Sequence, residues 1–259
     1  MALRALFQAD VGRQPMRQVL TGALEQLAAG VRSGLIMASK QAERELAADA
    51  DPPNVVPSVA LARERRRIRG HVSRQLARCV TALDALIAQT VSIRPSRTPN
   101  EALETFPDAV RPAVEHIERV LTASTLPGHE RQRADAVFRA ALDGMKRTLA
   151  KRLPAARQTA DLLTALAVGA WTIRAETDER LRPLTEEWPL ERQSAVDRNI
   201  LRLATFELLH CPETPPAVVM NEAVELAKRY GSDESSRFVN GVLAALAAAA
   251  GLVPAGGAK

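Results

Sequence analysis

The 259-residue chain is long enough for one large domain or two smaller ones. Its hydrophobic share of 46% permits a core, and an aromatic content of only 3% beside abundant Ala and Leu favours helix over strand. Cys79 and Cys211 are far apart, which argues against a disulfide framework or a Cys-based metal site and fits a reducing compartment. No signal-peptide pattern is found, and the longest apolar run, residues 242–253, is shorter than the about 20 residues that cross a bilayer. We therefore expect a cytoplasmic protein without a membrane segment.

The basic excess is confined to the middle of the chain. Residues 1–58 carry six basic and six acidic side chains, residues 59–187 carry 22 and 16, and residues 188–259 carry seven and eight. A basic surface attracts polyanions. The basic excess of the middle segment is therefore a modest indication that this segment binds them.

Apolar residues recur at helical spacing throughout the chain. A first amphipathic stretch begins with Leu3 and Leu6, residues 12–15 break it, and a second stretch follows. The Pro- and Asp-rich residues 49–57 predict a linker, and a long helix is expected at about 58–90. The apolar face of that helix comprises Leu61, Ile68, Val72, Leu76, Val80, Leu83 and Ile87.

The rest of the middle segment predicts further helices. Residues 94–99 predict a second linker, and Asp108 is a candidate cap for the helix after it. The pair Pro127-Gly128 predicts a break, after which two helices are expected, at about 129–153 and 155–181.

The last third predicts three shorter helices separated by turns. Gly231 stands where a helix end often needs a left-handed residue, and Ser232 or Asp233 can cap the third helix. Gly241 lies inside that helix, where glycine is unfavourable, so we expect a close approach of two helices there.

These helices carry a resemblance to a known family. The segments "VDRNILRLATFELL", "VVMNEAVELAKRYG" and "SSRFVNGVL" resemble the C-terminal half of NusB proteins, in the same order and spacing. The start, "ALRALFQAD", is similar to the first helix of that family, and "LLTALAVGAWTIRAETDERLRPLTEEW" is similar to the segment that joins its halves.

The resemblance implies an all-α fold, a NusB-like pair of helical bundles with an additional helical insertion. It implies the N-terminal part of the NusB-like domain at residues 1–34, the insertion at 35–155, the C-terminal part at 156–252 and a tail at 253–259. We expect the insertion to form helices of its own. Family members carry an Arg-rich arm before the first helix. This chain begins almost inside that helix, so the arm lies upstream of the sequence or RNA affinity comes from elsewhere.

The resemblance also implies a function. NusB proteins are not enzymes: they pair with the ribosomal protein NusE, bind boxA-type RNA and support antitermination of ribosomal RNA transcription in the transcription elongation complex. A homodimer is possible in the family, so a dimerisation module, or an accessory module of ribosomal RNA modification machinery, is the alternative. The histidines are scattered and no Gly-rich phosphate loop exists, so we expect no catalytic residue, metal or cofactor.

The candidate RNA-binding residues gather at the start of the third C-terminal helix. Ser235, Ser236 and Arg237 offer hydroxyl, backbone N–H and guanidinium donors of the kind that phosphates accept from. Phe238 beside them can stack on a base, although its apolar neighbours on the helix also suit a core position. The matching region touches RNA in the family.

Other candidates are more scattered. Lys228 and Arg4 are further RNA candidates, although a cation at a helix end, such as Lys228, also complements the helix dipole. Phe7 and Asp197 match positions that face NusE; the alternatives are core packing for Phe7 and a solvated carboxylate for Asp197.

An arginine-rich run in the middle segment has two possible interpretations. It comprises Arg63-Glu64-Arg65-Arg66-Arg67 together with Arg69, Arg74 and Arg78. On a helix these side chains spread over the surface opposite the apolar face. They form either a solvated helix face or a supplementary RNA contact.

Overall fold

The computed structural model describes residues 1–48, 57–186 and 188–253. The chain divides into two compact units, residues 1–23 with 161–259, here called the terminal unit, and residues 24–160, the central unit. The division falls within α2 (Met16–Ala47) and α5 (Gly128–Thr172). The sequence-based boundaries after residues 34 and 155 stay predictions. Every regular element in the described ranges is helical, which confirms the all-α fold class. Within these ranges, no helix has both the length and the apolar character needed to cross a bilayer.

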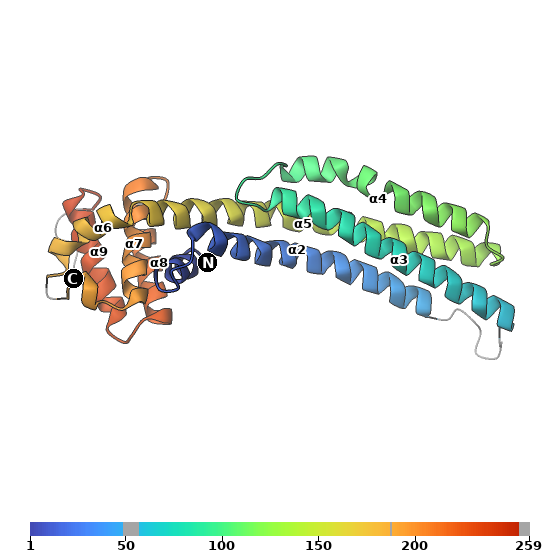
Figure 1. The fold of residues 1–259 in the computed structure, drawn as a ribbon, viewed down its shortest axis with the longest axis horizontal. Helices are drawn as coiled ribbons and strands as arrows, with labels where there is room; N and C mark the ends of the chain where they lie inside the picture. Colours follow the sequence, from blue (N-terminus) through green and yellow to red (C-terminus); the bar gives the residue numbers. More distant parts are fainter. Residues whose placement is uncertain (49–56, 187, 254–259) are drawn as a thin grey trace. The chain divides into compact units, whose positions relative to one another are not determined.

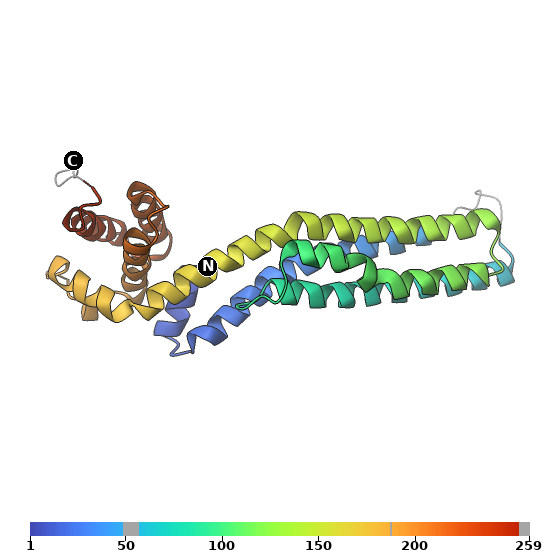
Figure 2. The ribbon, with the colours of Figure 1, turned by 90° about the horizontal axis from the view of Figure 1, so that it is seen from above.

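The central unit is a bundle of four helices, formed by parts of α2 and α5 together with α3 (Val59–Thr90) and α4 (Pro99–Thr122). These helices lie side by side and alternate in direction (Figures 1 and 2). The predicted apolar face of α3 is confirmed, because Ile68, Val72, Leu76, Leu83 and Ile87 are buried and Leu61 and Val80 are half-buried. The ion pair of Arg65 with Glu130, at 2.8 Å, joins α3 to α5.

The start of α4 differs from the prediction. Thr98 caps the helix, since its hydroxyl accepts from the backbone N–H of Glu101 while the Glu101 carboxylate accepts from the N–H of Thr98. This reciprocal arrangement satisfies two donors at the helix end, and Pro99 suits the first helical position. Asp108 therefore lies inside α4, paired with Arg111, and the cap predicted at Asp108 is wrong.

The predicted break at Pro154 is also wrong, because Pro154 lies inside α5, a single helix of 45 residues. Proline in a helix interior costs about 3 kcal/mol, since it lacks an N–H and its ring meets the preceding turn. Leu149 and Leu153 are fully buried in that region of the helix. Burying a leucine side chain contributes about 1.5–3 kcal/mol, so packing can offset the proline. The chain breaks later, between α5 and the short α6 (Arg174–Leu181).

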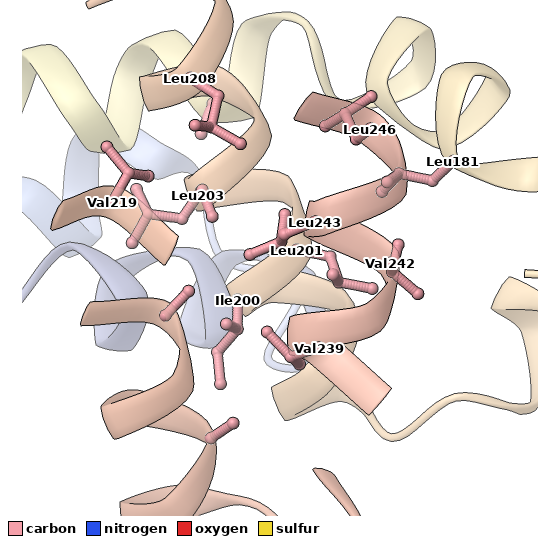
Figure 3. Packing of buried hydrophobic residues seen from close by; sticks show 14 of the residues in the cluster. Leu181, Ile200, Leu201, Leu203, Leu208, Val219, Val239, Val242, Leu243 and Leu246 are labelled. Atoms are coloured by element: carbon pink, nitrogen blue, oxygen red, sulfur yellow. The ribbon is translucent and has the colours of Figure 1, made fainter. Parts of the chain in front are cut away.

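The terminal unit is built around α7 (Ala195–His210). The other α-helices that lie wholly in this unit are α1 (Ala2–Asp10), α6, α8 (Pro216–Tyr230) and α9 (Ser235–Ala249), and α7 contacts all four of them. The unit also includes the start of α2, the end of α5 and two short 3-10 helices, at Arg182–Leu184 and Leu190–Arg192. Ile200, Leu201 and Leu203 of α7 are buried against side chains of α8 and α9 (Figure 3). A helix enclosed on nearly all sides must also satisfy its polar side chains internally.

A partly buried polar network meets much of that requirement. One carboxylate oxygen of Asp10 accepts from Arg198 and Asn199, both at 3.0 Å, and Arg202 lies 3.3 Å from it. Arg202 also donates to both carboxylate oxygens of Asp178 in α6. The network therefore joins α1 and α6 to the central helix α7.

The two C-terminal glycines have different roles from those predicted. Gly231 has extended backbone, with φ −94°, rather than the left-handed conformation. It is needed for space, because a Cβ there would lie 2.5 Å from the Ser235 hydroxyl. Neither Ser232 nor Asp233 caps α9, whose preceding residue, Glu234, makes no side-chain cap. Gly241 is exposed with open space around it, so the predicted close helix approach there is wrong.

Candidate functional site

Ser235 begins α9 and is almost wholly buried, with 2% of its surface exposed. Its hydroxyl accepts from the backbone N–H of Ser232 at 2.8 Å and lies 3.0 Å from the Ser232 hydroxyl. The side chain thus stabilises the tight turn between α8 and α9. The RNA contact predicted for Ser235 stays a prediction, and its hydroxyl is already bonded within the protein.

The next two residues are more accessible. Arg237 has an 88% exposed side chain, and its guanidinium lies 3.6 Å from the exposed carboxylate of Glu234. An ion pair so open to solvent contributes little and leaves the guanidinium available to another anion. Ser236 is half-buried. Both belong to the first turn of α9, where backbone N–H groups have no partner within the helix and the dipole favours negative charge.

Phe238 lies between a core position and a surface position. It is half-buried and packs at the edge of the hydrophobic cluster of the terminal unit. Its ring centroid lies 6.3 Å from that of Trp188, with the two planes inclined by 43°. Trp188 is 55% exposed. The exposed Trp188 ring and the half-buried Phe238 ring therefore form an aromatic pair, and Phe238 directly follows Arg237 in the chain.

No local sequence pattern assigned Trp188 to this surface. It is the only tryptophan outside α5, and it precedes the Pro189-Leu190 turn that leads into α7. An aromatic residue in a polar loop was the available signal. Its partner, 50 positions further along the chain, could not be inferred from helical periodicity.

Lys228 and Arg4 lie apart from this cluster in the chain. The Lys228 ammonium is 2.7 Å from Glu225, one turn earlier on the exposed side of α8. Arg4 is exposed on α1. Both are accessible cations, and their contact with RNA stays a prediction.

The two candidate partner-facing residues differ in accessibility. Phe7 is 37% exposed on α1, while its neighbours Leu3 and Leu6 enter the core. Asp197 is buried in the first turn of α7 rather than solvated, and Ser194 donates to one of its carboxylate oxygens at 2.9 Å. The other oxygen, Oδ1, is buried with no hydrogen-bond partner among the described residues. A buried acceptor without a hydrogen-bond partner costs free energy, so this oxygen lowers the stability of the local structure.

The NusB family model matches residues 115–248, which is more than half of the chain. The chain belongs to the NusB family. The match begins inside residues 35–155, the segment predicted to be the insertion. It includes all of α6, α7 and α8, with the candidate residues at the start of α9.

Relatives of the chain carry the name transcription antitermination protein NusB. That of Dehalococcoides mccartyi (strain ATCC BAA-2266 / KCTC 15142 / 195) is 36% identical over 139 residues, which cover 54% of this chain and 90% of the relative. That of Sorangium cellulosum (strain So ce56) is 55% identical over 78 residues, which cover 30% of this chain and 56% of the relative. For several relatives, as for the Sorangium protein, this chain spans only about half their length.

A solved structure of T. maritima NusB is 36% identical and aligns with 38% of this chain and 74% of its own length, with a TM-score of 0.34.

Proposed function

We propose that the protein is an RNA-binding transcription antitermination factor that binds boxA-type RNA together with the ribosomal protein NusE and supports ribosomal RNA transcription. The observation that carries this proposal is the match to NusB of Dehalococcoides mccartyi over 90% of that protein's length. The elongation complex of RNA polymerase would be the wider assembly. The proposed role is recognition, with no catalytic step, metal or cofactor.

Two surfaces of the terminal unit support the proposal. The first is the start of α9, where Arg237, the first helical turn and the Trp188–Phe238 ring pair lie close together in the fold. A cation and helix N–H groups suit phosphate, and exposed rings suit unstacked bases of single-stranded RNA. The second is the region around the exposed Phe7 of α1; Asp197, in the first turn of the adjacent helix α7, is buried.

A protein that binds two partners can act through recognition alone. When NusE is docked, RNA that contacts both proteins gains affinity that neither protein supplies alone, because the second contact becomes intramolecular. Affinity for boxA-type RNA would therefore rise when the ribosomal protein is present.

A titration of fluorescently labelled RNA tests the proposal. The ligands are a boxA-type RNA and a scrambled RNA of equal length, each with and without NusE. We expect tighter binding of the boxA-type RNA and a further increase with NusE. Equal affinities for both RNAs under both conditions would overturn the proposed function. Molar mass measured in parallel separates an RNA-dependent complex from the alternative of a self-associating module.

A further inference from the structure

The chain's positive charge lies in the central unit, of which residues 24–114 are outside the NusB family match. Residues 1–23 and 161–259 together carry 13 basic and 15 acidic side chains, whereas residues 24–160 carry 22 basic and 15 acidic ones. Phosphate neutralisation supplies much of the affinity of RNA-binding proteins. The terminal unit, with a small acidic excess, is poorly suited to supply it alone.

Within the central unit, four exposed arginines form a stripe along α3. The arginine stripe comprises Arg63, Arg66, Arg74 and Arg78. At about 100° per residue they fall within an arc of about 120°, and the span from Arg63 to Arg78 is about 22 Å. The buried face of α3, which includes Val72 and Leu83, lies on the opposite side of the helix. The stripe therefore faces solvent along its whole length.

These arginines have no acidic partner among the residues that the structure describes. Their neighbours on α3 differ, since Arg65 pairs with Glu130 and Arg67 pairs with Glu64. Like charges four positions apart, as at Arg74 and Arg78, destabilise a helix. An uncompensated row of this kind fits a surface that an anionic partner neutralises.

We propose that the arginine stripe of α3 binds the phosphates of single-stranded RNA without sequence preference. Guanidinium groups suit phosphate because they donate two hydrogen bonds in a planar fork. The helix has no Phe, Tyr or Trp, so base stacking is not available and the contact is to the backbone alone. The inference rests on the proposed RNA-binding function: a nonspecific contact in the same chain raises the effective concentration of RNA near the sequence-reading surface.

The test compares two variants of the full chain with equal loss of charge. The stripe variant is R63Q/R66Q/R74Q/R78Q, and glutamine keeps helix propensity close to that of arginine. The matched control is K40Q/K146Q/R147Q/K151Q, which removes four exposed cations of the same unit from α2 and α5. Circular dichroism and the thermal midpoint establish that both variants fold. The probe is a 20-nucleotide oligouridine, which has no boxA sequence, titrated at several salt concentrations.

We expect the stripe variant to bind oligouridine about tenfold or more weakly at low salt, with a log–log salt slope smaller by about 2–3, from about 0.7 per lost phosphate contact. The control variant should keep most of the affinity and slope. Equal losses in both variants would indicate a diffuse charge effect and overturn the proposal, as would unchanged binding in the folded stripe variant. Stronger binding of polyglutamate than of oligouridine would identify an acidic protein as the partner and also overturn it.

This experiment is separable from the test of the proposed function. Discrimination between boxA-type and scrambled RNA belongs to the terminal unit, whereas oligouridine binding reports on the stripe. Loss of discrimination with the oligouridine result intact would reject the proposed function alone.

Discussion

Arg202 of α7 donates from Nε and Nη2 to the two carboxylate oxygens of Asp178 in α6, at distances of 2.8 and 2.6 Å. The same arginine approaches Asp10 of α1, which also accepts from Arg198 and Asn199. A two-pronged pair of this kind fixes orientation as well as distance. The terminal unit is therefore held by a partly buried network of ion pairs as well as by its apolar core.

The first prediction concerns the stability of this network. Burial alone would raise the pKa of Asp10, but hydrogen bonds from Arg198 and Asn199 and the charge of Arg202 hold it below its ordinary value. Its stabilising contribution is therefore present above the unfolded-state pKa of about 4 and is lost as pH falls through the lower folded-state pKa. Asp10→Asn should lower the free energy of unfolding by about 1–3 kcal/mol at pH 7, the range for hydrogen bonds to charged groups.

A control for Asp10→Asn is available in the same unit. Glu176 forms an exposed pair with Arg180 on α6, and Glu176→Gln should change stability by less than about 0.5 kcal/mol. Denaturant unfolding at pH 7 measures both variants. Equal stability changes in the two would show that the buried network contributes no more than a surface ion pair.

The second prediction concerns a histidine pair in the central unit. His71 Nδ1 lies 3.1 Å from His116 Nε2. Burial and the nearby charges of Arg74, His116 and Arg67 lower the pKa of His71, against the opposing effect of Glu64. Because the neutral form is favoured in the folded protein, stability is greatest above about pH 6.5 and falls as pH drops through the folded-state pKa.

The variant His71→Gln tests this pH dependence. The thermal midpoint of the parent protein should fall between pH 7.5 and 5.5, and the fall should be smaller in His71→Gln. His129 is largely exposed, so His129→Gln is the matched control and should keep the parent's pH dependence. Identical pH profiles in all three proteins would exclude the histidine pair as a source of acid sensitivity.

Local sequence patterns predicted much of the fold. The apolar face of α3 repeats every three, four or seven residues, and burial follows that period. The cap was predicted at Asp108 alone, whereas Thr98 and Glu101, which have the spacing of a reciprocal cap, begin the helix. The helix break predicted at Pro154 is wrong because the packing of the helix on both sides of Pro154 stabilises it by more than the lost hydrogen bond costs. No local sequence pattern reports that packing.

The candidate site was less accessible to sequence reasoning. Arg237 and Phe238 are adjacent in the chain, so the resemblance could assign both to one candidate site. It could not place Trp188 against Phe238, because these rings meet only through the tertiary fold. The same holds for Asp10 and Arg198, which are separated by 188 positions. Burial of Asp197 was missed for a similar reason: its helix is enclosed on nearly all sides, so helical periodicity marks no exposed face.

The third prediction compares two glycines in the terminal unit. A Cβ at Gly169 of α5 would overlap the ring of Phe206 in α7, whereas a Cβ at Gly241 would meet nothing. Gly169→Ala should destabilise the protein by about 1–3 kcal/mol through overpacking. Gly241→Ala should stabilise it by up to about 1 kcal/mol, because alanine is the better helix former. Thermal denaturation measures both, and the same sign for the two variants would contradict the packing of α5 against α7.

The last prediction concerns the aromatic pair of Trp188 and Phe238. If the pair stacks on RNA bases, Trp188→Ala should weaken binding of boxA-type RNA by about 1–3 kcal/mol. Its effect on stability should be small, because the side chain is 55% exposed. Phe238→Leu removes the ring but keeps apolar volume, so it should cost less than about 1.5 kcal/mol of stability while also weakening RNA binding. Tyr230 is comparably exposed on α8 and provides the control, since Tyr230→Ala should leave RNA affinity unchanged. RNA affinity equal to that of the parent in folded Trp188→Ala and Phe238→Leu proteins would show that the two rings only pack against each other, and the aromatic part of the proposed RNA surface would then be wrong.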